Sequence, residues 1–181
     1  KRLPKVPFSG MPVKLFLIFY QMTFGLYLYF WFLGNYRDFT SYKKLKLNPE
    51  LLALGLFVFT VLPYFFYGVI QRTLNVQEVN QGVDISLNLA VAGIETAFLY
   101  FQFQMFSGFL KKKLAKPFSV PVVILPLFIL SGLKKVLAPT IPFYIFWEMA
   151  LILLQGGVLA IVQRDLNLYW KVENERDQRI N

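Results

Sequence analysis

The stretch LFLIFYQMTFGLYLYFWFLGNY, residues 15–36, indicates the fold class, because none of its 22 residues is charged. A second uncharged stretch, LLALGLFVFTVLPYFFYGVI, covers residues 51–70. A helix of about 20 apolar residues crosses the hydrocarbon core of a bilayer, which is about 30 Å thick. The two stretches therefore predict a multi-pass membrane protein.

The whole chain of 181 residues has the composition of a membrane protein. Its apolar fraction is 56% and its charged fraction 16%, against about 45–50% and about 25% in soluble domains. Further apolar stretches lie at residues 84–109, 118–133 and 140–163. We therefore expect an all-α fold, a polytopic membrane helix bundle with four to five hydrophobic segments. The expected parts are a basic N-terminal segment at 1–14, the bundle at 15–163 and a polar C-terminal tail at 164–181.

The absence of cysteine and histidine from the sequence excludes several kinds of chemistry. The chain can form no disulfide, no thiolate nucleophile, no zinc-finger ligand set and no histidine-based catalytic triad. The sequence also lacks a glycine-rich phosphate loop and clustered carboxylates for a metal pair. We therefore expect no enzymatic activity, no metal and no cofactor. Structural lipids or pigments would suit the high aromatic content of 18%.

The net charge of +9 comes from basic residues that flank the apolar stretches. This placement is typical of anchoring to anionic headgroups and not of nucleic-acid binding. The residues expected to contact anionic lipids are Lys43, Lys44, Lys111, Lys112 and Lys113. The partners predicted from charge are therefore membrane lipids, and no nucleic acid.

The positions of the 19 basic residues also predict an orientation in the membrane. Five simple crossings would place at best 12 of them on one side and 7 on the other. A first segment that bends near Gly25 and leaves by the side it entered would place 16 on one side and 3 on the other. The positive-inside rule favours this re-entrant arrangement, with both chain ends cytoplasmic. A plain first transmembrane helix stays open, since 22 residues fit one crossing.

The sequence TFGLYLYFW at residues 23–31 resembles a signature of small bacterial multi-pass membrane proteins of unknown function. That signature reads Thr-x-Gly-x-Tyr-x-x-Tyr-Trp, and this chain has Phe30 in place of its second Tyr. The sequence LNLYW at residues 166–170 is similar to the Leu-Asn-x-Tyr-Trp pattern that often ends the family's last helix. The resemblance implies a helical fold in the bacterial cytoplasmic (inner) membrane. It carries over no activity.

Aromatic residues near the ends of the apolar stretches suggest membrane anchors. A Tyr hydroxyl or Trp indole N–H can face the headgroups while its ring faces the hydrocarbon. The expected interfacial anchors are Tyr27, Tyr29, Trp31, Tyr169 and Trp170.

A stripe of polar residues inside the apolar stretches is the strongest functional signal. Asn88, Glu95 and Gln102 recur every seven residues, which places them on one face of a helix. Glu148 and Gln155 repeat that spacing in the last apolar stretch. A carboxylate at the bilayer centre costs at least about 2.5 kcal/mol, so such groups face protein or water. We therefore expect the two polar faces to meet inside the bundle.

Three roles are open for this intramembrane polar stripe. It can act as polar glue that fixes the helix register, within the chain or against partner subunits. It can form a proton or cation path through Glu95 and Glu148, together with Lys134 or Lys135. It can also line a cavity for lipid or another hydrophobic substrate.

The sequence as a whole predicts a small, non-catalytic accessory or scaffolding subunit of a larger membrane protein complex. The chain shows no nucleotide site and no redox ligand set. Other membrane protein subunits would then be its partners. The alternative is a compact proton- or ion-coupled transporter or channel that uses Glu95 and Glu148.

Overall fold

The computed structural model describes residues 11–23, 25–43, 48–73, 81–137 and 144–180, and in those ranges the chain forms six α-helices and no β-strand. The helices are α1 (Val13–Met22), α2 (Tyr27–Lys43), α3 (Pro49–Thr73), α4 (Gln81–Leu110), α5 (Val120–Leu137) and α6 (Tyr144–Ile180). The predicted all-α fold is therefore confirmed for the described part of the chain.

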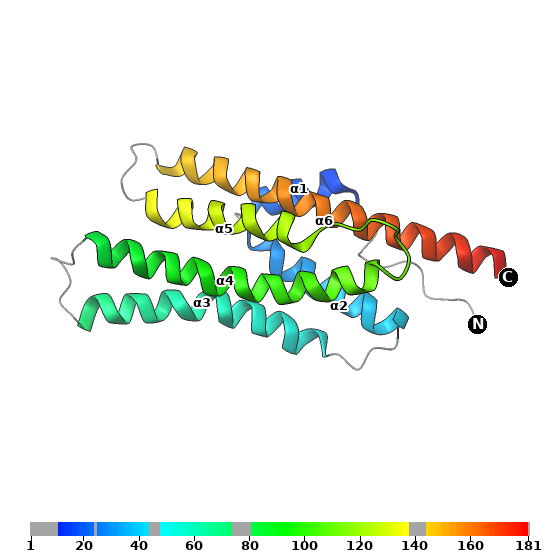
Figure 1. The fold of residues 1–181 in the computed structure, drawn as a ribbon, viewed down its shortest axis with the longest axis horizontal. Coiled ribbons are helices and arrows are strands. Elements are labelled where there is room, and N and C mark those ends of the chain that lie inside the picture. The colour runs from blue at the N-terminus through cyan, green and yellow to red at the C-terminus, as the bar shows by residue number, and fades with distance from the viewer. Residues whose placement is uncertain (1–10, 24, 44–47, 74–80, 138–143, 181) are drawn as a thin grey trace.

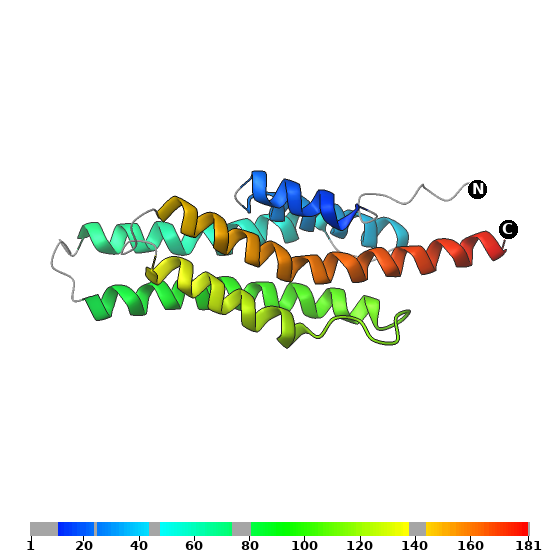
Figure 2. The same cartoon turned by 90° about the horizontal axis from the view of Figure 1, so that it is seen from above.

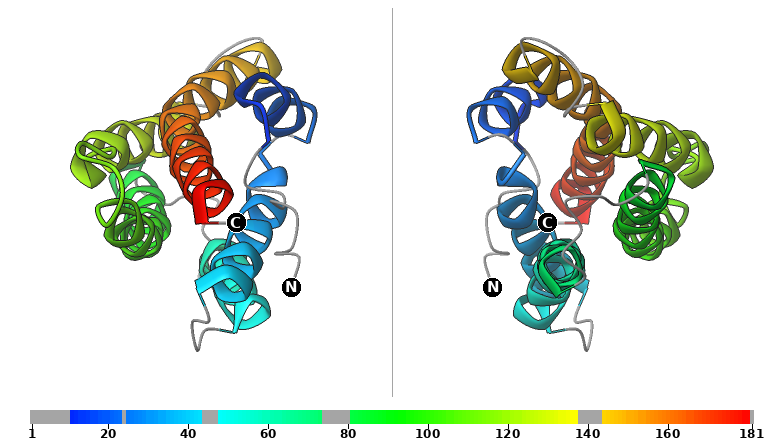
Figure 3. Two further views of the ribbon diagram at one scale, coloured as in Figure 1. Left: turned by 90° about the vertical axis from the view of Figure 1, so that its right-hand side faces the viewer. Right: turned by 90° about the vertical axis from the view of Figure 1, so that its left-hand side faces the viewer.

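Helices α3, α4, α5 and α6 lie side by side along the long axis of the molecule, and each runs opposite to the one before it (Figure 1). Helices α1 and α2 lie in one half of this length (Figure 2). The contacts between helices follow the order α1, α6, α5, α4, α3, α2, and α2 contacts α1 again. Seen along the axis, the six helices therefore form a ring (Figure 3).

The helix ends differ from the predicted segments in the second half of the chain. The stretch expected at 118–133 becomes α5, which includes Pro126 and continues to Leu137. Helix α6 continues past residue 163 to Ile180 without a break. Leu166, Tyr169 and Trp170 are each at most 1% exposed, so one face of this extension packs against the bundle, and this face includes the carboxylates of Asp165 and Glu173. This burial explains why the polar tail is helical.

The first apolar stretch forms two helices, because the chain turns between Met22 and Tyr27. Gly25 has a φ of +87°, a left-handed conformation that suits glycine. Its amide donates to the carbonyl of Tyr20 at 2.9 Å, a bond typical of helix ends at glycine. The hydroxyl of Thr23 donates to the carbonyl of Phe19 at 2.8 Å and accepts from the amide of Tyr27 at 2.9 Å. The turn therefore ends α1 and starts α2.

The contacts of α1 and α2 with α6 show that the chain reverses direction at this turn. The Met11 carbonyl, just before α1, accepts from Asn167 at 2.9 Å, whereas Gln21 near the end of α1 donates to the Met149 carbonyl at 3.3 Å. Helix α1 is therefore antiparallel to α6. Helix α2 runs parallel to α6, since Trp31 donates to Gln163 and the Phe39 ring lies 5.4 Å from the Trp170 ring. The bend predicted near Gly25 is present, and α1 and α2 form a hairpin (Figure 2).

The outer surface of the bundle is apolar and its interior holds polar groups. Large side chains such as Phe30, Phe101 and Phe146 are 65%, 68% and 72% exposed. In contrast, Gln102 and Gln163 are 5% and 1% exposed. Exposed apolar side chains of this size and number suit apolar surroundings.

Within the described ranges, two helices are long and apolar enough to cross a membrane, by length and composition. They are Ile85–Leu110, with a mean hydropathy of 1.2, and Ile145–Glu173, with a mean hydropathy of 2.0. A core helix of a soluble protein can pass the same test when it is mostly buried. Here 22% and 28% of the most apolar windows are buried, so these helices are not of that kind. Shorter apolar helices lie at Val13–Met22, Pro49–Val58 and Val120–Lys134.

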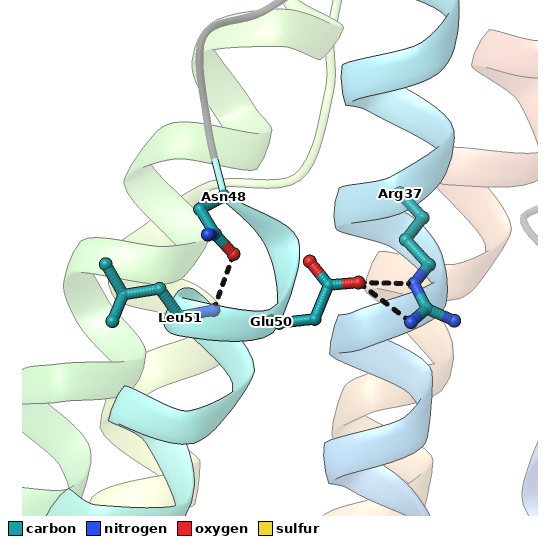
Figure 4. A network of polar contacts seen from close by, with 4 residues as sticks. All are labelled: Arg37, Asn48, Glu50 and Leu51. Carbon is teal, nitrogen blue, oxygen red and sulfur yellow. Dashed lines mark hydrogen bonds and ion pairs between the residues drawn. The ribbon is translucent and has the colours of Figure 1, made fainter.

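The connection between α2 and α3 is fixed by polar contacts at one end of the bundle (Figure 4). The Asn48 side chain accepts from the amide of Leu51 at 2.9 Å and caps α3, as its sequence predicts. The Arg37 guanidinium donates to Glu50 at 3.1 and 2.8 Å, and these hydrogen bonds hold the pKa of that carboxyl below its ordinary value. Both side chains are more than half exposed, so the pair orients the helix start and adds little stability.

The positive φ of Gly25 leads to the first prediction. In Gly25→Ala we expect the free energy of unfolding to fall by about 1–2 kcal/mol, because an L side chain is strained in the left-handed region. Gly157→Ala is the matched control, since Gly157 is helical and a Cβ there meets no atom within 4 Å. Thermal unfolding of the detergent-solubilised protein, followed by tryptophan fluorescence, measures both variants. Equal midpoints for the two would contradict the role of the turn.

Candidate functional site

A cavity of about 190 Å³ lies at the centre of the ring of helices. Every helix contributes at least one lining residue: Tyr20 from α1, Tyr29 from α2, Leu56 from α3, Glu95 from α4, Ser131 from α5 and Gln155 from α6. Gly25 and Leu26 of the hairpin turn line it too. The reversal of the chain therefore places the turn against this cavity.

The cavity holds polar groups in an otherwise apolar bundle. Glu95 accepts a hydrogen bond from the Ser131 hydroxyl at 3.1 Å. Thr96 and Gln155 also line the space, and the Thr96 hydroxyl donates to the carbonyl of Ala92 at 2.7 Å. A water molecule needs two to four polar partners and takes about 30 Å³ in the liquid. The cavity therefore has the room and the polar groups to hold several waters or a small polar ligand.

An ion pair lies at the edge of the cavity. Lys134 of α5 lines the space and its ammonium is 2.8 Å from a carboxylate oxygen of Glu148 on α6. The two side chains are 29% and 24% exposed, so solvent screens the pair only in part. The described side chains around the cavity thus supply two carboxyl groups, from Glu95 and Glu148, and one amine. With all three ionised, their sum is one negative charge.

The predicted polar stripe is brought together in part. Glu95 and Gln155 line the cavity, and Glu148 reaches its edge through Lys134. Gln102 is 5% exposed and accepts a hydrogen bond from the hydroxyl of Tyr36, so it contacts α2 and lies apart from the cavity. Asn88 lies two turns before Glu95 on α4, is half-buried and does not line the cavity.

The predicted aromatic anchors lie mainly inside the protein. Trp31, Tyr169 and Trp170 are each 1% exposed, Tyr27 is 9% exposed and Tyr29 is half-buried. This position differs from the exposed belts expected from the sequence. The physical reason is the hairpin, which packs Trp31 against Phe32 and Phe106 with ring centroids at 4.9 and 5.8 Å.

The predicted lipid-contacting lysines are described in part. Lys111 and Lys112 are exposed after the end of α4. Lys113 lies 3.3 Å from Glu173 of α6, so this lysine makes an ion pair inside the protein. The side chain of Lys43 and the whole of Lys44 lie outside the described residues.

Ser131, Thr96 and Gln163 are polar contacts that the sevenfold spacing does not indicate. The Gln163 side chain accepts from the Trp31 indole and donates to the Met11 carbonyl at 3.1 Å, which joins α2 and α6 to the start of α1. The sequence gives a signal for Ser131, which is a polar residue inside an apolar stretch, whereas Thr96 and Gln163 each adjoin a charged residue. The partners of Ser131 and Gln163 lie on other helices, and helical spacing alone does not identify them. The Thr96 hydroxyl donates to a carbonyl of its own helix.

Comparison with known proteins adds no functional assignment. No protein-family model, no curated protein and no solved structure matches this chain. The resemblance of residues 23–31 to a bacterial membrane family therefore stays a prediction.

The ion pair at the cavity edge leads to the second prediction. A double-mutant cycle of Lys134→Met and Glu148→Gln should give a coupling free energy of about 0.5–3 kcal/mol, as for other residues in direct contact. The readout is the free energy of unfolding in detergent. The control cycle is Lys171→Met and Glu175→Gln, an exposed pair at 4.0 Å that should couple by less than about 0.5 kcal/mol. Equal coupling free energies in the two cycles would show that the Lys134–Glu148 pair stabilises the protein no more than an exposed pair does.

Proposed function

We propose that this chain is a polytopic membrane protein in which α3, α4, α5 and α6 cross the bilayer and the α1–α2 hairpin enters and leaves by one side. The apolar outer surface and the polar groups buried inside the bundle support this arrangement. Helix α3 has 25 residues and is about 37 Å long, enough for a crossing. The end of α4 with the basic residues after it, the end of α2 and the end of α6 fall at the same end of the bundle, which the positive-inside rule makes cytoplasmic. The bacterial inner membrane is the setting that the sequence resemblance adds.

This topology can be tested by cysteine labelling, because the chain has no cysteine of its own. Single cysteines at Pro12, Ser41 and Lys112 should react with a membrane-impermeant maleimide from the same side of sealed vesicles. A cysteine at Thr73 should react from the other side, since α3 ends at the opposite end of the bundle (Figure 1). Labelling of Pro12 and Ser41 from opposite sides would mean that the first apolar stretch crosses the membrane and that the hairpin proposal is wrong.

The function that the geometry supports best is a compact proton- or cation-coupled transporter or channel. One observation carries this proposal: the central cavity contains Glu95, and the turn of the hairpin lines the same space. Non-helical backbone at membrane depth is tolerated where it is buried in protein or lines a water-filled cavity. Ionisable groups inside membrane proteins are concentrated at substrate and ion pathways. The position of the hairpin turn and the position of Glu95 therefore both indicate the central cavity as the ion pathway.

The charges favour a proton or a small cation over an anion. Glu95 and Glu148 outnumber Lys134 around the cavity, and the uptake of one positive charge would restore neutrality. The hydroxyls of Ser131 and Thr96 and the amide of Gln155 supply oxygen atoms, which suit a hard cation or a chain of waters.

Proton flux in liposomes tests the proposal. Purified protein should carry protons down an imposed pH gradient, measured with an internal pH-sensitive dye. Glu95→Gln should reduce the flux to the level of protein-free liposomes, because an amide keeps the shape of the side chain but exchanges no proton. Its unfolding temperature should stay near that of the parent, since Gln keeps an acceptor for Ser131. A monovalent cation gradient, tested in the same way, covers the second ion class.

The control and the opposing result come from two further variants. Glu175→Gln removes an exposed carboxylate on α6 and should leave the flux unchanged. Glu95→Leu should lower stability by about 0.6–2 kcal/mol, the usual worth of an interhelical polar contact in a membrane. If Glu95→Leu is destabilised while neither the parent nor Glu95→Gln carries an ion, Glu95 is polar glue and the transport proposal is wrong.

The second candidate function is that of an accessory or scaffolding subunit of a larger membrane complex. The observation that favours it is the exposure of α3, which contacts α2 and α4 and leaves several large side chains uncovered. Leu54, Phe65 and Phe66 are 56%, 64% and 54% exposed. Co-purification at native expression, with identification of bound membrane proteins, separates this role from lipid exposure. A partner that protects cysteines introduced on α3 from labelling would support it.

A further inference from the structure

A groove on the outside of the bundle lies between α4 and α5 and is separate from the polar stripe. It has a volume of about 550 Å³, inside the range of about 300–1,000 Å³ for small-molecule sites. Its wall includes Gly93, Ala97 and Phe101 from α4, and Leu125 and Phe128 from α5. Such a surface suits a hydrocarbon ligand and offers little to a polar one.

The face of α4 that forms the groove continues to a cluster of exposed lysines. Ala97, Phe101, Gln104, Gly108 and Lys111 follow each other at intervals of three or four residues, and all five are exposed. Residues at this spacing share one face of a helix. A Cβ at Gly108 would meet no atom within 4 Å, so the path along this face is open.

The length of this path equals the depth of one bilayer leaflet. The ten residues from Phe101 to Lys111 rise by about 15 Å at about 1.5 Å per residue. Half of a hydrocarbon core of about 30 Å is the same distance. An acyl chain that lies in the groove would therefore place its headgroup near Lys111, Lys112 and Lys116, which are all exposed.

We infer that the α4–α5 groove binds an acyl chain of an anionic phospholipid whose headgroup contacts Lys111, Lys112 and Lys116. Charge complementarity selects this occupant, because the groove ends at basic side chains. The inference rests on the proposed membrane location and is independent of ion transport through the central cavity.

Lipid binding to delipidated protein in detergent tests this inference. Native mass spectrometry should show saturable binding of phosphatidylglycerol, with binding of phosphatidylcholine at least tenfold weaker. Gly93→Leu fills the groove and should weaken phosphatidylglycerol binding at least tenfold. Gly157→Leu is its control, because Gly157 is a helical glycine with equally open space on α6. Lys112→Gln should weaken binding about fivefold, the contribution of one lysine near an anionic surface, and Lys171→Gln should leave it unchanged.

Two results would overturn the lipid site. Equal binding of both lipids, unaffected by Gly93→Leu, would mean that the groove holds unselective bilayer lipid. Release of a co-purified membrane protein by Gly93→Leu, with lipid binding unchanged, would mean that a partner helix occupies the groove. Cysteine labelling of the same variants reports their membrane insertion, so a failed lipid site is distinguished from a failed membrane assignment.

Discussion

The reversal of the chain between Met22 and Tyr27 determines how the first two helices pack, because the peptide groups of a turn leave the helical pattern of hydrogen bonds. In hydrocarbon such groups find no water, and each one without a partner is costly. The turn provides partners of its own through Gly25 and Thr23. Gly25 and Leu26 of the turn also line the polar cavity. Leu26 is nevertheless 61% exposed, so the turn lies where the cavity meets the outer surface of the bundle.

The hairpin divides the bundle into two regions with different chemistry. On the side of its open end, the space between helices is filled by aromatic rings, with Phe106 in contact with Trp31, Phe32, Tyr36 and Phe39 at centroid distances of 5.5–5.8 Å. Offset and edge-to-face ring pairs of this kind hold helices without leaving space. At the level of the turn the rings give way to the cavity. The packed aromatic region therefore holds the helices in place around the unfilled cavity, and a binding site requires such support.

The sequence predicts the helical class and the bend, but only part of the site. Uncharged runs indicate apolar helices, and a glycine in the first run together with the distribution of basic residues predicts the reversal. The sevenfold spacing places Glu95 and Gln102 on one face of α4. This spacing does not show that Glu95 lines the cavity while Gln102 contacts Tyr36. Those contacts depend on which helix lies opposite each of the two residues. The prediction that Tyr169 and Trp170 are interfacial anchors is wrong, because both side chains are buried. Membrane interfaces and aromatic cores use the same residue types, so the sequence alone does not separate the two positions.

The polar contacts that hold the helices together are largely distinct from those around the cavity. Trp31 with Gln163, and Tyr36 with Gln102, join neutral groups in the aromatic half. The charged groups Glu95, Lys134 and Glu148 gather where the structure leaves room for a ligand. If their sole role were to fix the helix register, neutral amides would serve at lower desolvation cost, as they do nearby. Buried charges occur in both halves, however, because Asp165 and Glu173 are 3% and 2% exposed. What distinguishes Glu95, Lys134 and Glu148 is the cavity beside them, and this is the feature that the proposed ion site explains.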